Sequence, residues 1–354
     1  MWSLALQVGG DDNASRLNVL EKTMRIGEAT VRFGGIAGVG TRPKYRLKGY
    51  ASRVMYASTR LMTERGYDMG VLFGIGNFYH RFGYAVVFPI SRLHLKTEAL
   101  LCAAALLKTR AMKAADAKAA QRLYNRLNGN RVASVVRPGG WSYFELSPGF
   151  EKSGRAIIVE DARGRIQGYA TWRVQDEQFL VAEIGGTGSD AFASLGRALG
   201  QRARAAKMEQ VIFDLPRDDA FVDFCVPLGC EHRVTYTRNS DAMARIIHLK
   251  SLMEKLVPEF SKRSAGFSGR VSVSIETDIG TVGLGIDRHG VRVIRAGVLA
   301  VVMPQLILTQ LVMGYRSATD IAADPGVVVP EKAIPVLDLL FPKRDCYMWW
   351  SDRF

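Results

Sequence analysis

A basic turn at residues 42–51, with the sequence RPKYRLKGYA, carries the first side chains that could do chemistry. It places Lys44, Arg46 and Lys48 just before Gly49, where a helical pattern of apolar residues begins. Free N–H groups and the positive dipole end at a helix start favour an anion such as a pyrophosphate, and a glycine lets the anion come close. The alternative is a solvated basic turn. The glycine after Lys48 favours phosphate binding.

A second candidate is the aromatic segment at residues 78–84, FYHRFGY, which follows a short predicted strand. The phenol of Tyr79 lies at the loop edge of the sheet, where it could act as an acid. The alternative is a packed aromatic side chain, which periodicity alone favours. His80 could also be an acid or base, but a surface position fits it better.

The third candidate is the chain end. Residues 346–350, CYMWW, are apolar, which predicts a docked tail rather than a frayed one. Docking would bring in the α-carboxylate of Phe354, whose reference pKa is about 3.5, where it could hold an amine and accept a proton. Two alternatives stay open: a purely structural tail, or Asp352 as the acid that matters.

Glycines interrupt the strand that precedes the basic turn. Gly35, Gly38 and Gly40 indicate a bulge or a close backbone approach, and such a strand could offer the N–H of Val39 to a thioester oxygen. The alternative is a plain glycine-rich strand. The spacing matches neither a dinucleotide fingerprint nor a Walker A loop.

These candidates need a strand, a turn, a helix and a second strand to position them. The sequence predicts strands at Val31–Thr41 and Asp68–Phe73, joined by the helix that begins at Gly49. An apolar run at Trp2–Val8 and a hairpin turning at Ile26-Gly27 precede this unit.

Residues 46–51 and 78–84 resemble the coenzyme A pyrophosphate loop and the Tyr segment of Eis-type (enhanced intracellular survival) proteins of the GNAT acetyltransferase superfamily, and the terminal Phe354 matches as well. The resemblance implies acetyl-CoA as co-substrate, no metal, Tyr79 as general acid and the Phe354 carboxylate as general base. It also implies a cofactor site that comprises Val39, Gly40, Thr41, Arg46, Leu47, Lys48, Gly49, Tyr50, Ala51, Ser52 and Asn77.

The same resemblance implies an α+β fold of tandem GNAT-like domains with mixed sheets, followed by a sterol-carrier-like α+β domain. We place the domains at residues 1–92, 93–240 and 241–354. The second should contain a strand at Val132–Val136 and repeat the strand–helix–strand plan, with a helix at Ser189–Ala206 and a strand at Gln210–Leu215. The turn before that helix, residues 185–190 (GGTGSD), lacks the pyrophosphate pattern, so this domain is expected to be degenerate. The third should open with a long helix, Met243–Phe260. Its residues Leu306, Ile307, Leu311 and Val312 fit a core better than a lipid groove.

The first domain starts about fifty residues short of the family pattern, which predicts an N-terminal truncation.

The composition bears on the ligands, the metal content and the cellular location to expect. A net charge of +14 favours anionic ligands without specifying one, and 48% hydrophobic residues support well-filled cores. The four cysteines are scattered; Cys225 and Cys230 have no second ligand pair for zinc. No signal peptide is evident. The apolar run Ala296–Tyr315 divides into a strand, Gly297–Val302, and a helix with Pro304 in its first turn, so we expect a cytoplasmic protein without a membrane span.

The hypothesis is an acetyl-CoA-dependent N-acetyltransferase in which an amine attacks directly in a ternary complex. The acceptor is expected to be a small polyamine or aminoglycoside-like molecule, or a protein lysine, and not a nucleic acid. The resemblance implies a homo-oligomer, a trimer or hexamer. The alternative is a non-catalytic acyl-CoA-binding or lipid-carrier protein.

Overall fold

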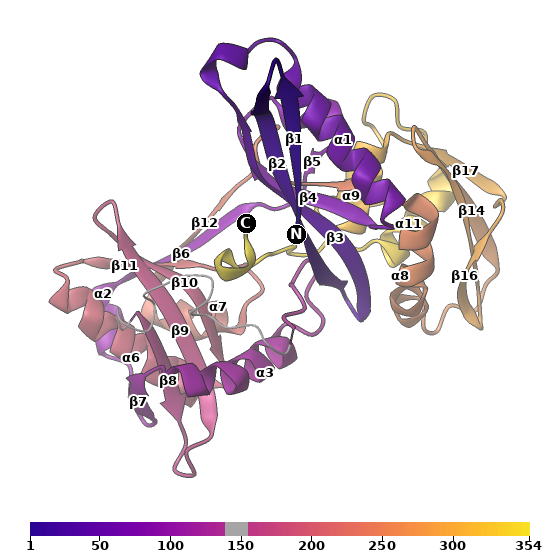
Figure 1. Ribbon diagram of the computed structural model, residues 1–354. Helices are drawn as coiled ribbons and strands as arrows, with labels where there is room; N and C mark the ends of the chain where they lie inside the picture. The colour runs from indigo at the N-terminus through magenta and orange to yellow at the C-terminus, as the bar shows by residue number, and fades with distance from the viewer. Residues whose placement is uncertain (139–154) are drawn as a thin grey trace.

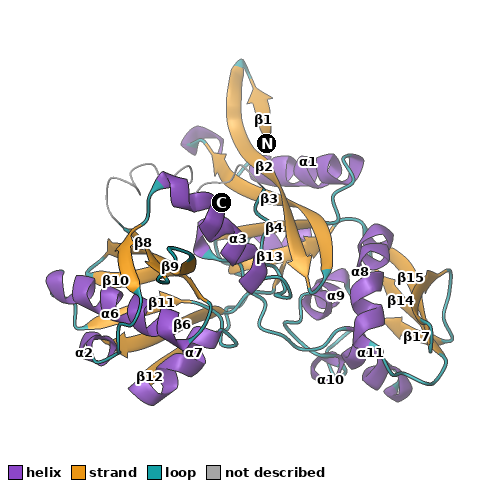
Figure 2. Ribbon diagram, turned by 90° about the horizontal axis from the view of Figure 1, so that it is seen from below, coloured by secondary structure: helices purple, strands orange, loops and turns teal. Residues whose placement is uncertain are grey.

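The computed structural model describes residues 1–138 and 155–354 as an α+β protein with three mixed sheets (Figures 1 and 2). The first sheet has the order β1-β2-β3-β4-β13-β5. Its strands are β1 (Trp2–Val8), β2 (Asp11–Ile26), β3 (Ala29–Thr41), β4 (Met69–Gly74), β5 (Ala85–Val86) and β13 (Asp241–Ile246). The predicted hairpin forms between β2 and β3, with Ile26 opposite Ala29.

The predicted strand–helix–strand unit is confirmed. Helix α1 (Tyr50–Glu64) connects β3 to β4, which run parallel. The two strands pair only where Phe33–Ile36 faces Met69–Leu72, although β3 continues to Thr41 and β4 to Gly74. Beyond Ile36 the ladder is open, and a site can form between the strands.

The second sheet has the order β12-β6-β11-β10-β9-β8-β7. Its strands are β6 (Ile90–Lys96), β7 (Lys108–Ala111), β8 (Ala156–Glu160), β9 (Ile166–Gln175), β10 (Gln178–Gly186), β11 (Gln210–Asp214) and β12 (Cys230–Thr235). The accompanying helices are α2 (Thr97–Leu101), α3 (Ala117–Leu127), α6 (Ser189–Ala205) and α7 (Ala220–Cys225). Strands β10 and β11 are parallel and α6 connects them, which repeats the plan of β3, α1 and β4.

One predicted strand in this region is wrong. Residues 132–136 form no strand of the second sheet; Val135 instead makes an isolated bridge to Met24 of β2, and Ser134 accepts a backbone hydrogen bond from Arg25. The apolar run that suggested a strand is buried against the first sheet.

The third sheet has the order β16-β15-β14-β17. Its strands are β14 (Val271–Thr277), β15 (Gly280–Asp287), β16 (Gly290–Ile294) and β17 (Leu299–Val302), with helices α8 (Leu249–Arg263), α9 (Gln305–Val312), α10 (Ala318–Ile321) and α11 (Ile334–Leu340). The predicted strand–helix division of Ala296–Tyr315 is confirmed by β17 and α9. Among the described residues, no helix is long and apolar enough to span a bilayer.

The expected helix Met243–Phe260 needs correction. Residues 243–246 are not helical but belong to β13, which pairs with β4 on one side and β5 on the other, so Asp241–Ile246 completes the first sheet. Helix α8 begins only at Leu249. A strand buried between two neighbours is apolar on both faces. Its apolar run therefore lacks the alternation of a half-buried strand and looks like the start of the helix that follows.

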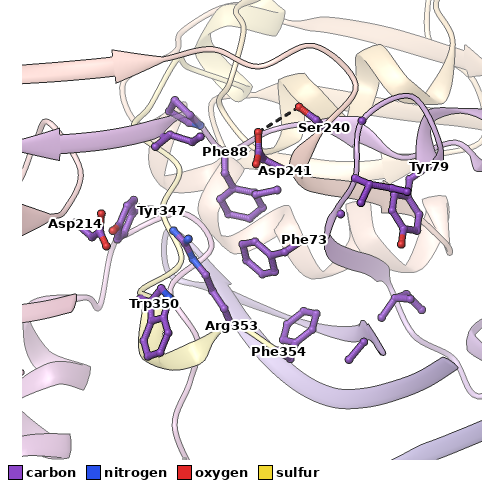
Figure 3. Close-up of a pocket in the computed structure, with 18 of the residues that line it drawn as sticks. Phe73, Tyr79, Phe88, Asp214, Ser240, Asp241, Tyr347, Trp350, Arg353 and Phe354 are labelled. Atoms are coloured by element: carbon purple, nitrogen blue, oxygen red, sulfur yellow. Dashed lines mark hydrogen bonds between the residues drawn. The ribbon is translucent and has the colours of Figure 1, made fainter. Parts of the chain in front are cut away.

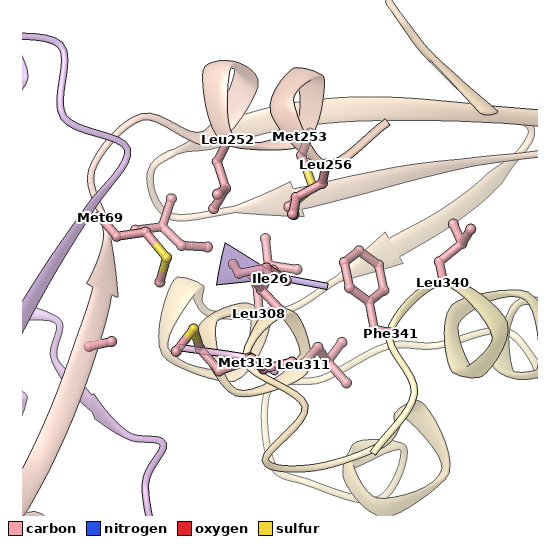
Figure 4. Close-up of a cluster of buried hydrophobic side chains, with 14 of the residues drawn as sticks. Ile26, Met69, Leu252, Met253, Leu256, Leu308, Leu311, Met313, Leu340 and Phe341 are labelled. Atoms are coloured by element: carbon pink, nitrogen blue, oxygen red, sulfur yellow. The ribbon is translucent and has the colours of Figure 1, made fainter. Parts of the chain in front are cut away.

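The first and third sheets share one core. Ile26 and Met69 of the first sheet pack with Leu252 and Met253 of α8 and Leu308 of α9 (Figure 4). Helix α1 covers the opposite face of the first sheet through buried Val54, Met55 and Met62. In the same shared core Leu311 and Val312 are buried, and Leu306 and Ile307 pack against it, so these four residues are core.

Candidate active site

A cavity of about 870 Å³ opens where β3 and β4 stop pairing (Figure 3). The first sheet contributes Ile36, Ala37, Gly38 and Val39 of β3 and Phe73 and Gly74 of β4. The second sheet contributes Arg92, Arg173 and Asp214, and the chain end contributes Tyr347, Trp350, Arg353 and Phe354. The cavity therefore lies between two sheets and is closed by the C-terminal tail.

Tyr79 lines this cavity from a short 3₁₀ turn, Tyr79–Phe82, that follows β4. Its ring lies edge-on to Phe78, at 4.9 Å between centroids. A Cβ at Gly74 would come within 2.1 Å of that ring, so glycine is required there. Burial raises the pKa of the Tyr79 phenol, which keeps the phenol protonated and able to act as an acid. His80 is not among the residues that line the cavity.

Phe354 also lines the cavity, so the structure brings together the two residues predicted to catalyse. Its ring packs between Phe33 and Phe73, with centroid distances of 6.2 and 5.6 Å. A Cβ on Gly35 would lie 2.6 Å from the Phe354 ring. Gly35 is thus one of the glycines at which a close approach is predicted, and the group that approaches it is the Phe354 ring at the chain end.

The predicted bulge is in the same strand. Arg16 faces Gly40 while Asn18 faces Ala37, so β3 carries an extra residue around Gly38, whose φ is +60°. The bulge places Gly38 and Val39 on the cavity wall. A position for a thioester oxygen near Val39 remains a prediction.

The docked tail is confirmed. Tyr347 and Trp349 are buried in the core of the second sheet, and the indole of Trp349 donates a 2.8 Å hydrogen bond to Asn128 Oδ1. The Nζ of Lys22 donates to the backbone carbonyl of Asp352 at 3.1 Å. The last residues are thereby held between the first and second sheets.

Asp352 is an anchor and not a residue of the cavity. Its carboxylate is fully buried and accepts hydrogen bonds from Arg137 at 2.9 Å and from the phenol of Tyr124 at 3.0 Å. Arg137 also forms a bidentate pair with fully buried Glu183, at 2.8 Å. Burial alone would raise the pKa of Glu183, but the charge and hydrogen bonds of Arg137 outweigh it, and the pKa is lowered. Asp352 is therefore a positioning residue for Phe354.

The basic turn is largely exposed and leads directly into α1. Leu47 and Gly49 adopt positive φ values of +60° and +76°, and α1 begins at Tyr50. Lys44 pairs with Asp11 at 3.3 Å, and Arg46 donates a hydrogen bond to the Thr41 carbonyl at 3.3 Å. Lys48, the third cation of the turn, makes no hydrogen bond to a described residue. Leu47 is fully exposed, which agrees with a loop that presents its backbone.

The remaining predicted cofactor residues fall in three places. Gly40 and Thr41 end β3, where the Thr41 hydroxyl is 2.9 Å from that of Ser15. Tyr50, Ala51 and Ser52 form the first turn of α1. Asn77 lies outside the cavity wall, and its N–H donates to the carbonyl of Asn239 at 2.8 Å.

Sequence reasoning missed five charged residues of the cavity: Arg92, Arg173, Asp214, Asp241 and Arg353. Asp241 lies on β13, which pairs with β4, whereas Arg92, Arg173 and Asp214 lie on β6, β9 and β11 of the second sheet, and Arg353 lies in the tail. No motif joins them in the sequence, and only the topology could have revealed them.

Comparisons with known proteins agree with this geometry. Residues 5–87 match the family model described as an acetyltransferase (GNAT) domain. No curated protein matches the chain.

Among solved structures, a probable N-acyltransferase of unknown function from Enterococcus faecalis V583 superposes with a TM-score of 0.81 at 19% identity, over 99% of this chain and 89% of that one. A GCN5-related N-acetyltransferase from Kribbella flavida gives 0.74 at 18% identity, over 98% and 86%. Eis1 from Mycobacterium abscessus gives 0.69 at 16% identity, over 99% and 90%. These identities establish a shared fold. Residues 5–87 of the protein therefore carry a domain of the GNAT acetyltransferase type.

Proposed function

We propose that the protein transfers an acetyl group from acetyl-CoA to an amine by direct attack in a ternary complex. The observation that carries this proposal is that Tyr79 and Phe354, from opposite ends of the chain, line one cavity beside the open ladder of β3 and β4. The basic turn at the start of α1 would hold the pyrophosphate through Arg46, Lys48 and the backbone around Gly49.

In the proposed reaction the amine nitrogen attacks the thioester carbonyl carbon, so a C–N bond forms and the C–S bond breaks. The departing coenzyme A thiolate takes the phenolic proton of Tyr79. The proton lost from the amine passes to the Phe354 carboxylate, directly or through water. The N–H of Val39, in the β3 bulge, would stabilise the charge that develops on the carbonyl oxygen.

One feature of the fold supports the tandem arrangement. The β10–α6–β11 unit repeats β3–α1–β4, but the first turn of α6 carries Asp190 where a phosphate would lie. We propose that the second sheet belongs to a degenerate GNAT-like domain, that the third resembles a sterol carrier, and that the chain forms a trimer or hexamer. Light scattering of the purified protein tests the last point.

The test of the activity is a free-thiol assay with purified protein, acetyl-CoA and a panel of amines. We expect amine-dependent release of coenzyme A, and mass spectrometry should find the acetylated amine. A chain extended by one glycine beyond Phe354 keeps the ring but moves the carboxylate, and should lose turnover while still binding acetyl-CoA. Release of thiol without an acetylated product, or no release with any amine, contradicts the proposal.

A further inference from the structure

The two ends of the cavity differ in charge. In Figure 3, Tyr79 lies on one side of the cavity, Asp214 and Tyr347 lie on the other, and Phe73 and Phe88 lie between them.

The end around Asp214 is basic. Arg92 Nε lies 3.1 Å from Asp214 Oδ1 and Arg173 Nη2 lies 3.4 Å from Asp214 Oδ2. Arg353 reaches the cavity from the tail and donates its Nε to the Met348 carbonyl at 3.3 Å. Two guanidinium groups thus pair with one carboxylate, and a third, that of Arg353, lies 5.0 Å from the Phe73 ring centroid, which leaves an excess of positive charge.

Donors at this end are not satisfied. Arg173 Nε and Nη1 and the Tyr347 hydroxyl are buried and have no hydrogen-bond partner among the residues that the structure describes. The Arg173 guanidinium lies 4.3 Å from the Trp350 ring centroid, which fixes its plane but supplies no acceptor. Buried donors without acceptors are costly, and an anionic ligand would supply the missing oxygens.

Away from Asp214 the cavity carries one further side-chain carboxylate, that of Asp241, which Figure 3 shows beside Phe88. Asp241 faces Gly74 across the β13–β4 ladder, and Gly74 lies against the Tyr79 ring. The Asp241 carboxylate accepts a 3.2 Å hydrogen bond from the Ser240 hydroxyl. The chain end, Phe354, lines the same cavity. A carboxylate on this side suits a cationic amine before it loses its proton.

We infer that the acceptor is a zwitterion: an amine that binds near Tyr79, joined through an apolar segment to a carboxylate or phosphate that binds Arg173 and Arg92. This inference rests on the proposed acetyl transfer and names its substrate class. The Phe73 and Phe88 rings pack against the apolar segment. A polycation, by contrast, would place a positive group against the three arginines and bind less well.

The experiment compares acceptors that share an aminomethyl group on a benzene ring but differ in the substituent opposite it. The thiol assay is run with 4-(aminomethyl)benzoate, 4-(aminomethyl)phenylphosphonate, 4-methylbenzylamine and 1,4-bis(aminomethyl)benzene. We expect kcat/KM for one of the two anionic acceptors to exceed that of the neutral-ended and doubly cationic ones by roughly tenfold or more, the size of a hydrogen bond to a charged group. Which anion is preferred distinguishes carboxylate from phosphate.

Two variants test whether the preference for an anionic acceptor arises at Arg173 and Arg92. Arg173→Gln and the more exposed Arg92→Gln should each raise KM for the anionic acceptor roughly tenfold while kcat/KM for 4-methylbenzylamine stays within about twofold. Arg92→Gln covers the case in which Arg173→Gln does not fold. Arg163→Gln, in the exposed turn between β8 and β9, makes the same change of charge away from the cavity and should alter neither.

The outcomes separate the two proposals. If no amine is acetylated, the proposed function fails. If amines are acetylated but the doubly cationic or neutral-ended acceptor is preferred, only the zwitterion inference is overturned. It is also overturned if the arginine variants raise KM for acetyl-CoA instead of KM for the acceptor.

Discussion

At the scale of single residues, the site depends on two glycines as much as on its reactive groups. Gly74 leaves room for the Tyr79 ring and Gly35 leaves room for the Phe354 ring. Neither glycine has a positive φ, so close approach is the reason for both, not backbone conformation. The phenol and the chain end can thus both reach the same opening in the sheet.

Replacing Tyr79 by Phe should remove the proton donor without removing the packed ring. We expect kcat to fall by about 10²-fold or more, the usual contribution of a positioned acid, while KM for acetyl-CoA stays nearly unchanged. Tyr236→Phe, an exposed tyrosine outside the cavity wall, is the matched control. Full activity in Tyr79→Phe would assign the acid elsewhere.

The pH dependence of kcat provides a second test of Tyr79. Its pKa is raised by burial above the ordinary tyrosine value of about 10, and an acid acts only while protonated, so the active form extends to higher pH. We therefore expect the alkaline limb of the kcat profile to lie above pH 10. A limb centred below pH 10 that disappears in Tyr79→Phe would contradict this assignment.

At the scale of elements, β3 does two jobs along its length. Its first half pairs with β4, and its second half carries the bulge at Gly38 and faces the cavity. The chain end packs at the junction, over Gly35. A change at that residue should therefore displace the tail before it disturbs the sheet.

Gly35→Ala tests this arrangement. The added methyl would lie 2.6 Å from the Phe354 ring, so the ring must move, at a cost of about 1–3 kcal/mol in the free energy of unfolding. We expect at least a tenfold loss of kcat in a protein that still melts cooperatively. Gly129→Ala, where the nearest atom is 3.5 Å away, should be close to wild type in both measurements. Unchanged kcat in Gly35→Ala would separate Phe354 from catalysis.

The basic turn before α1 is the other element that can be tested alone. Arg46→Gln and Lys48→Gln should each weaken coenzyme A binding by roughly tenfold, because each removes a charged donor to phosphate. Isothermal calorimetry at low and high salt measures this, and the wild-type affinity should fall as salt rises. Arg60→Gln, on the exposed side of α1 and paired with Glu64, is the control. Equal affinity in all variants would rule out this turn as the phosphate site.

At the scale of the whole molecule, the chain end connects all three sheets. Tyr347 and Trp349 pack into the second core, Met348 packs into the core shared by the first and third sheets, and Phe354 lies against β3. The buried group formed by Arg137, Glu183 and Asp352 fixes this path. Separate domains that share a tail should therefore unfold together.

Arg137→Met tests whether this buried group holds the chain end in place. It leaves Glu183 and Asp352 buried without their cation, which costs about 3–5 kcal/mol in the free energy of unfolding. We expect a lower urea midpoint and a larger loss of kcat than of acetyl-CoA binding, because the tail is released while the basic turn is untouched. Arg233→Met breaks the exposed pair with Glu231 and should cost less than about 1 kcal/mol. Equal effects of the two changes would contradict the anchoring role.

The sequence alone determined the parts of the protein that local patterns specify. The β3–α1–β4 unit, the basic turn, the second strand–helix–strand repeat and the docked tail all follow from periodicity, glycine placement and apolar runs in contiguous stretches. Tyr79 and Phe354 were predicted from local segments that resemble the GNAT family, and the structure places both on one cavity, while their catalytic roles stay predictions.

Only the tertiary structure decided where distant strands pair. It assigned Asp241–Ile246 to the first sheet, removed the strand expected at residues 132–136, and brought Arg92, Arg173, Asp214 and Asp241 to one cavity. Strand pairing across long stretches of chain is selected by burial of both faces and by the shape of the whole core, and neither is encoded in a local window. The charge at each end of the cavity is therefore a property of the fold.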